Sequence, residues 1–109
     1  MKKRIISDEN KKIINSFTRS LRAKKRTQTT IYNYVTDVEI FIKYCNKNIV
    51  DITENDFIAY MNYFKSIGNS SNRLIRRCRV VSSFYNFLCK QKIVNKNITK
   101  SMVILEFIN

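Results

Sequence analysis

Four arginines lie within a single seven-residue stretch: Arg73, Arg76, Arg77 and Arg79. The apolar residues around them recur with the period of an α-helix. Each arginine offers a planar fork of donors that grips a phosphate group or a guanine edge. Residues 70–91 contain no aspartate or glutamate that would pair with these charges along the helix. Arg76, Arg79 and Ser83 lie on the side opposite the apolar residues, and Arg73 and Arg77 lie toward one flank. The pattern favours contact with DNA over the alternative of a solvated basic face.

A second group of basic and polar residues surrounds the expected start of another helix. It comprises Lys24, Lys25, Arg26, Thr27, Thr29, Thr30, Tyr32 and Asn33. Hydroxyl and amide groups beside a helix N-terminus are suited to phosphate oxygens, because the first backbone N–H groups point outward there. Ordinary capping by Thr27 with a solvent-facing polar side is the alternative. Two basic groups near helix starts together predict a nucleic-acid interface.

The composition excludes the catalytic arrangements that depend on histidine or on several glycines. The sequence has no histidine, no proline and one glycine, Gly68. This composition excludes Ser-His-Asp and Cys-His catalysis and a glycine-rich phosphate loop. The acidic cluster of Asp51, Glu54 and Asp56 is better explained by helix capping than by a metal site. No catalytic residue, metal or cofactor is therefore expected.

The charge of the chain points to a polyanionic partner. Lysine and arginine number 21 against 8 acidic residues, which gives a net charge of +13. Residues 1–26 and 64–109 each carry +8, whereas the residues between them carry −3. Such an asymmetry is expected of a protein that turns one basic face toward nucleic acid or an anionic membrane.

The sequence predicts a cytoplasmic protein, nucleoid-associated when bound to DNA. No apolar run reaches the roughly 18 residues of a spanning helix, and no secretory signal follows Met1. The three cysteines lack Cys-x-x-Cys spacing and are odd in number, which is typical of reduced thiols. We expect double-stranded DNA as the partner, and neither a membrane nor a small-molecule substrate.

Four amphipathic helices are expected to position the candidate residues, so the predicted fold class is all-α. They are predicted from Ser7 or Asp8 to about Arg22, from Thr27 to about Asn46, from Thr53 to near Gly68, and from Ser70 or Ser71 to about Gln91. Thr53 and Asp56 have the spacing of a capping box, and Gly68 is a suitable helix end. The scarcity of glycine and proline argues against an all-β fold.

The apolar side of each expected helix predicts the core. Its members are Ile6, Ile13, Ile14, Phe17, Leu21, Ile31, Tyr34, Val35, Val38, Phe41, Ile42, Cys45, Phe57, Ile58, Met61, Phe64, Leu74, Cys78, Val81, Tyr85 and Leu88. We assign residues 1–97 to one helical domain, with residues 1–7 as a basic tail. We expect residues 98–109 to be an apolar tail or the start of a linker to a catalytic domain that this sequence lacks. Their pattern does not distinguish a short helix, a strand and an interdomain segment.

Four motifs, in the same order and with matching spacing, resemble the core-binding domain of tyrosine recombinases and phage integrases. Thr27, Thr30, Tyr34, Val38 and Phe41 resemble its opening pattern, Ser-x-x-Thr-x-x-x-Tyr-x-x-x-Leu-x-x-Phe. Residues 52–57, Ile-Thr-Glu-Asn-Asp-Phe, resemble Ile-Thr-x-x-Asp-Ile. Residues 76–88, Arg-Arg-Cys-Arg-Val-Val-Ser-Ser-Phe-Tyr-Asn-Phe-Leu, resemble Arg-Arg-Leu-Ser-Ala-Leu-Arg-x-Phe-Tyr-x-Phe-Leu. Residues 93–97, Ile-Val-Asn-Lys-Asn, stand where the family often reads Gly-x-Ile-x-x-Asn-Pro, without the final proline.

The resemblance covers about residues 8–97 and implies a SAM-like orthogonal bundle of four or five helices. It implies that the second and fourth helices face double-stranded DNA at the core recombination site. A separate C-terminal domain supplies the catalytic residues in this family, so this chain is expected to be the DNA-gripping part and not to cut DNA. Homo-oligomers are expected only for a full-length protein on DNA.

Two other functions are also compatible with the sequence. A helical protein-interaction domain with a basic surface would use the apolar residues 98–109 as a docking segment. A small nucleoid or RNA-binding protein would bind duplex RNA as well as duplex DNA.

Overall fold

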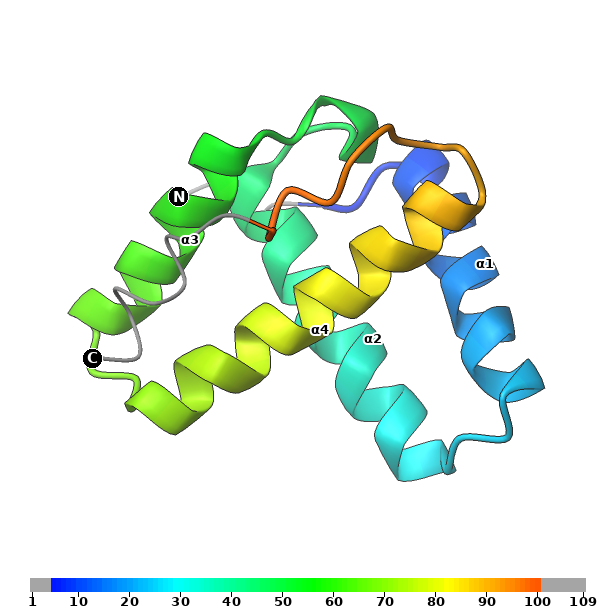
Figure 1. Cartoon of the computed structure of the whole chain (residues 1–109), viewed down its shortest axis with the longest axis horizontal. Helices are drawn as coiled ribbons and strands as arrows, with labels where there is room; N and C mark the ends of the chain where they lie inside the picture. The colour runs from blue at the N-terminus through cyan, green and yellow to red at the C-terminus, as the bar shows by residue number, and fades with distance from the viewer. Residues whose placement is uncertain (1–4, 101–109) are drawn as a thin grey trace. The chain divides into compact units, whose positions relative to one another are not determined.

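The computed structural model describes residues 5–100, and within that range it contains four α-helices, one short 3-10 helix and no β-strand (Figure 1). The predicted all-α fold class is therefore confirmed. The chain divides into two compact units, Met1–Asp51 and Ile52–Asn109.

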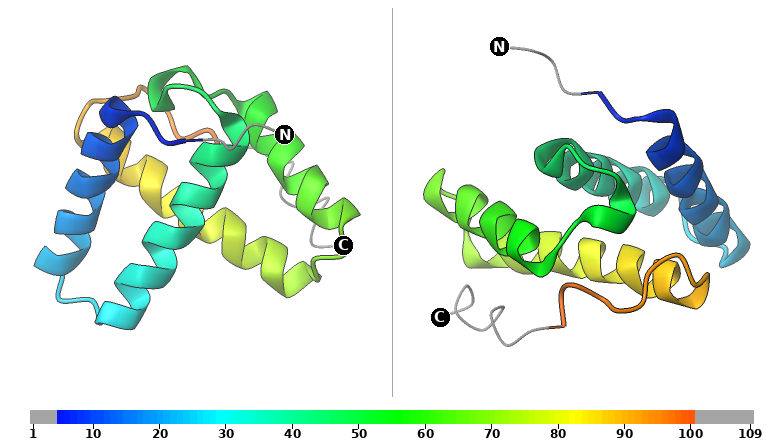
Figure 2. Two further views of the ribbon diagram at one scale, coloured as in Figure 1. Left: turned by 180° about the vertical axis from the view of Figure 1, so that it is seen from behind. Right: turned by 90° about the horizontal axis from the view of Figure 1, so that it is seen from above.

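The first unit is a pair of neighbouring helices followed by a 3-10 helix. Helix α1 spans Asp8–Ala23, α2 spans Gln28–Cys45 and η1 spans Ile49–Asp51. A tight turn joins α1 to α2, and the two helices lie side by side (Figure 2). Ser7 and Thr27 cap the two helices by accepting hydrogen bonds from the N–H groups of Asn10 and Thr30, as their residue types predict.

The second unit is built from two helices and the segment that follows them. Helix α3 spans Glu54–Ser66 and α4 spans Ser71–Lys90, with Ser70 as the cap of α4. Thr53 and Asp56 form the predicted capping box at the start of α3. Residues 91–100 contain no regular element and return along α4 (Figure 2).

Three helices end in Schellman motifs, in which a residue with a left-handed backbone closes the helix with two backbone bonds. Gly68, with φ of +97°, closes α3 as its sequence predicts. Lys25 and Lys92 close α1 and α4 with φ of 57° and 60°. Lysine pays a steric penalty in this conformation that glycine avoids.

The predicted core is confirmed at most positions. Every predicted core residue of α4 is buried, as are Ile6, Ile14, Phe17, Leu21, Val38, Phe41, Ile42, Phe57 and Met61. The remaining predicted core residues are half-buried. Tyr60 and Phe84 are also fully buried, and the helical stripes did not include either residue.

Candidate nucleic-acid interface

The turn between α1 and α2 presents three consecutive basic residues to solvent. Lys24, Lys25 and Arg26 are all exposed, and their backbone forms the Schellman motif that ends α1. The N–H of Lys25 donates to the carbonyl of Arg22 at 2.9 Å, and that of Arg26 donates to Leu21 at 3.3 Å. These bonds define the backbone of the turn, from which all three side chains extend into solvent.

The start of α2 continues this basic turn with hydroxyl groups. Thr27 Oγ1 accepts from the N–H of Thr30 at 3.1 Å and donates to Thr30 Oγ1 at 2.9 Å. Thr29 is exposed and Asn33 is half-buried. The first turn of α2 holds no acidic residue, so none of its own side chains neutralises the partial positive charge at this helix end. The arrangement is suited to an anionic partner.

Tyr32 is one of the most exposed large hydrophobic side chains of the described residues, with 70% of its surface exposed. It borders a shallow groove between α1 and α2 of about 370 Å³. The groove is lined by Thr18, Arg22, Gln28, Ile31, Tyr32, Val35, Thr36 and Glu39. The residues of the second predicted group therefore lie together, at the turn and along the first turns of α2.

The α4 arginines divide into two kinds. Arg73, Arg76 and Arg79 are exposed, and Ser83 is half-buried on the same helix. Arg79 and Ser83 lie one turn apart, and therefore on one side of the helix. The first turn of α4 contains no acidic residue. Three of the four predicted arginines thus present charge to solvent along the first half of α4.

Arg77 instead points into the corner between α3 and α4. Its guanidinium carbon lies 3.9 Å from the centre of the Phe64 ring, and its Nε donates to Asn69 Oδ1 at 2.8 Å. Its Nη1 is buried and has no hydrogen-bond partner among the described residues. A guanidinium stacked on an aromatic ring and bonded to the adjoining loop acts to fix that corner.

The segment after α4 is fastened to the polar side of that helix, which the helical periodicity did not predict. Asn97 Nδ2 donates to the carbonyl of Ser82 at 2.9 Å and to Asn86 Oδ1 at 2.9 Å. Asn97 Oδ1 accepts from the N–H of Thr99 at 2.9 Å and from its hydroxyl at 2.6 Å. Ile98 and Thr99 are buried, so this part of the predicted C-terminal tail is anchored. Residues 101–109, which hold most of that apolar tail, lie outside the described residues.

Cys78 is a buried thiol beside this segment. Burial raises the pKa of Cys78 to about 11, while the charges of Lys100 and Arg79 act in the opposite direction. A thiol with so high a pKa is almost entirely protonated near neutral pH and is a poor nucleophile. Cys78 therefore serves packing, as its place in the helical stripe predicts.

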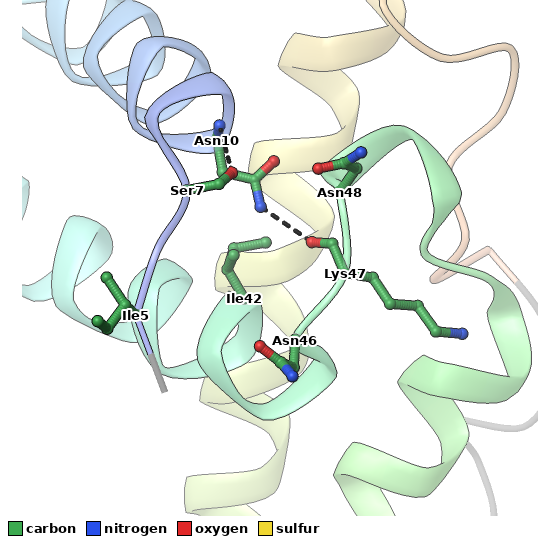
Figure 3. Close-up of a pocket in the computed structure, with 7 residues that line it drawn as sticks. All are labelled: Ile5, Ser7, Asn10, Ile42, Asn46, Lys47 and Asn48. Atoms are coloured by element: carbon green, nitrogen blue, oxygen red, sulfur yellow. Dashed lines mark hydrogen bonds between the residues drawn. The ribbon is translucent and has the colours of Figure 1, made fainter. Parts of the chain in front are cut away.

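A second hollow, of about 200 Å³, lies where α1 meets the loop after α2 (Figure 3). Asn10 is buried there, and its Nδ2 donates to the carbonyl of Lys47 at 2.9 Å. Its Oδ1 accepts from the N–H of Ile49 at 3.0 Å. Asn10 thereby forms hydrogen bonds with two backbone groups of the loop after α2. These bonds account for the burial of its amide, so no ligand is needed to explain it.

Neither a metal site nor a membrane span is seen in the part of the chain that the structure describes. No three histidine, cysteine, aspartate or glutamate side chains within residues 5–100 gather closely enough to hold a metal ion. None of the helices in that range is both long and apolar enough to cross a bilayer.

Comparison with protein families adds evidence that is independent of the surface geometry. Residues 13–95 match the family described as phage integrase, N-terminal SAM-like domain. No significant match was found among curated proteins or among solved structures. Because the match covers most of the chain, and because the four helices and their caps lie within or beside it, the resemblance noted in the sequence is confirmed. The chain belongs to the family of phage integrase N-terminal SAM-like domains.

Proposed function

We propose that this chain binds double-stranded DNA at the core recombination site of an integrase, as a module that holds DNA and does not cut it. Membership of the integrase family supports a role in site-specific recombination. The observation that carries the proposal is the exposure of basic residues at two places: the turn before α2 and the first half of α4.

The chemistry of these surfaces fits phosphate better than protein. Lys24, Lys25 and Arg26 precede a helix N-terminus whose first turn lacks acidic residues. Lysine and arginine charges, hydroxyls and outward backbone N–H groups are the donors that most often contact the DNA backbone. Such contacts release condensed counterions, so the binding gains strength at low salt.

The cation at residue 25 stands on a left-handed backbone. A left-handed residue after a helix is usually glycine, because a side chain is strained there. This chain places a lysine at that position, with its charge exposed. Glycine at this position would relieve the backbone strain but would remove one cation from the basic turn.

The arginines of α4 provide the second contact. Arg73 and Arg79 are exposed on a helix of 20 residues that contains no acidic side chain. Arginine binds phosphate or the O6 and N7 atoms of guanine through two parallel hydrogen bonds. We infer that Arg73, Arg76 and Arg79 contact DNA. Arg77 instead holds α4 in place through its contacts with Phe64 and Asn69.

The experiment measures binding of a fluorescently labelled duplex of about 25–30 base pairs by anisotropy over a salt series. The two test variants are Lys24→Ala/Lys25→Ala and Arg73→Ala/Arg79→Ala. The matched control is Lys11→Ala/Lys12→Ala, which removes the same charge from exposed positions of α1. Alanine at residue 25 keeps a side chain in the left-handed position, so the fold changes little.

Each test variant should weaken binding and reduce the slope of log K against log salt by about 2, because two phosphate contacts are lost. The control should keep the slope of the unmodified chain. Unchanged slopes in both folded test variants would overturn the assignment of these surfaces to DNA.

A further inference from the structure

The turn formed by residues 97–100 is built around one side chain. Asn97 Oδ1 accepts both the N–H and the hydroxyl of Thr99, and the carbonyl of Asn97 accepts the N–H of Lys100 at 3.2 Å. Ile98 and Thr99 are buried, with 5% and 6% of their surfaces exposed. The turn is therefore fixed at its base, and Lys100 leaves it as an exposed residue.

The same side chain fastens this turn to α4. Its Nδ2 donates to the Ser82 carbonyl and to Asn86 Oδ1, both at 2.9 Å, and lies 3.4 Å from Ser82 Oγ. Asn86 lies seven residues after Arg79, and two turns of an α-helix place such residues on one side. Asn97 thus rests at the C-terminal end of the polar side of α4 that bears Arg79.

Lys100, whose N–H donates to the carbonyl of Asn97, consequently lies on the side of α4 that bears Arg79, although the two residues are distant in sequence. The charges of Lys100 and Arg79 both act on the Cys78 thiol, which agrees with this placement. Arg79 and Lys100 are both exposed, so the positive surface of α4 continues onto the turn.

We propose that Lys100 is an additional phosphate-contacting residue of the α4 surface and that Asn97 is the residue that positions it. This inference rests on the proposed DNA binding. A lysine on an unattached segment would lose conformational freedom on binding, which weakens its contribution. The hydrogen bonds of the Asn97 side chain fix the backbone of the turn in advance.

The test uses the same duplex and salt series with Lys100→Ala, Asn97→Ala and the double variant. Lys12→Ala controls for the loss of one charge, and Asn95→Ala controls for the loss of an amide at an exposed position of the same segment. Lys100→Ala should reduce the slope by about 0.9, the value for one phosphate contact with duplex DNA. Asn97→Ala should give a similar reduction, and the double variant should lose no more than either single change.

The outcomes distinguish a failure of the proposed DNA binding from a failure of the roles assigned to Lys100 and Asn97. If the unmodified chain shows no salt-dependent binding, the proposed function itself fails. If the chain binds and Lys100→Ala keeps its slope, the contact by Lys100 is overturned. If Lys100→Ala and Asn97→Ala give fully additive losses, the positioning role of Asn97 is overturned.

A milder variant keeps the test decisive if Asn97→Ala unfolds. Thr99→Val removes only the 2.6 Å hydroxyl bond to Asn97 Oδ1 and keeps a side chain of similar shape. It should reduce the contribution of Lys100 in part, so that Lys100→Ala costs less in the Thr99→Val background than in the unmodified chain. An unchanged cost of Lys100→Ala in that background would contradict the positioning role.

Discussion

Replacing Arg77 by alanine should destabilise the fold, whereas replacing Arg79 should not. Arg77 stacks 3.9 Å from the centre of the Phe64 ring and donates to Asn69 Oδ1 at 2.8 Å. A hydrogen bond from a charged donor contributes about 1.5 kcal/mol or more, and a half-buried cation–π contact contributes about 1 kcal/mol. Removing the buried, unpartnered Nη1 returns up to about 1 kcal/mol. The expected net loss is about 1.5 kcal/mol.

The assay is thermal unfolding followed by circular dichroism. For a chain of this size, a loss of about 1.5 kcal/mol lowers Tm by about 6 °C. Arg79→Ala, an exposed arginine on the same helix, should change the stability by no more than about 0.5 kcal/mol. A double-mutant cycle with Asn69→Ala would measure the coupling between the two side chains.

Two results would refute the structural role of Arg77. One is a Tm of Arg77→Ala equal to that of Arg79→Ala. The other is a normal Tm together with a loss of salt-dependent DNA binding as large as that of Arg79→Ala. The second result would show that Arg77 contacts DNA, as the sequence alone suggests.

Three further predictions concern caps, backbone strain and thiol chemistry. Thr53→Ala removes half of the capping box of α3 and should cost about 1 kcal/mol of unfolding free energy; an unchanged urea midpoint would contradict this. Lys25→Gly removes the steric strain of a left-handed backbone and should raise the free energy of unfolding by about 0.5–1 kcal/mol, while it weakens DNA binding. A lower Tm of this variant would show that Lys25 is not strained. Because burial raises the pKa of Cys78 to about 11, iodoacetamide at about pH 8 should alkylate native Cys78 more slowly than half-buried Cys89. Mass spectrometry of the labelled peptides measures both rates, and equal rates would count against the burial of Cys78.

The helix boundaries could be predicted because the capping residues are local signals. Ser7, Thr27, Thr53 and Ser70 each accept the expected hydrogen bond from a backbone N–H three residues later. Such bonds depend on residue type and spacing and need no tertiary partner. The Schellman motifs at Lys25 and Lys92 carry no such signal, because lysine is not a residue that favours left-handed backbone.

The core could be predicted only where one apolar stripe is buried. Tyr60 and Phe84 lie off the stripes assigned to α3 and α4, yet both are fully buried. A helix that is covered on more than one side buries residues that a single-stripe pattern leaves out. How many sides of a helix are covered depends on tertiary packing, which the period of its apolar residues does not predict.

The candidate site was predictable by residue type and less so by role. The sequence alone does not distinguish the role of Arg77 from that of Arg76. Only the contacts of Arg77 with Phe64 and Asn69 show that it faces inward. Asn97 was included in the family resemblance, but its bonds to Ser82 and Asn86 span more than ten residues. Lys100 has no periodic signal, because the turn that places it is irregular.

Binding of a labelled duplex as a function of salt tests the central proposal most directly. About six phosphate contacts from the two basic surfaces predict saturable binding with a log–log slope near −5. Duplex RNA of the same length serves as the comparison, because its deep, narrow major groove presents the phosphates differently. A slope near −5 with preference for DNA is the expected result. Absence of saturable binding at low salt, or equal affinity for both duplexes, would contradict the proposed function.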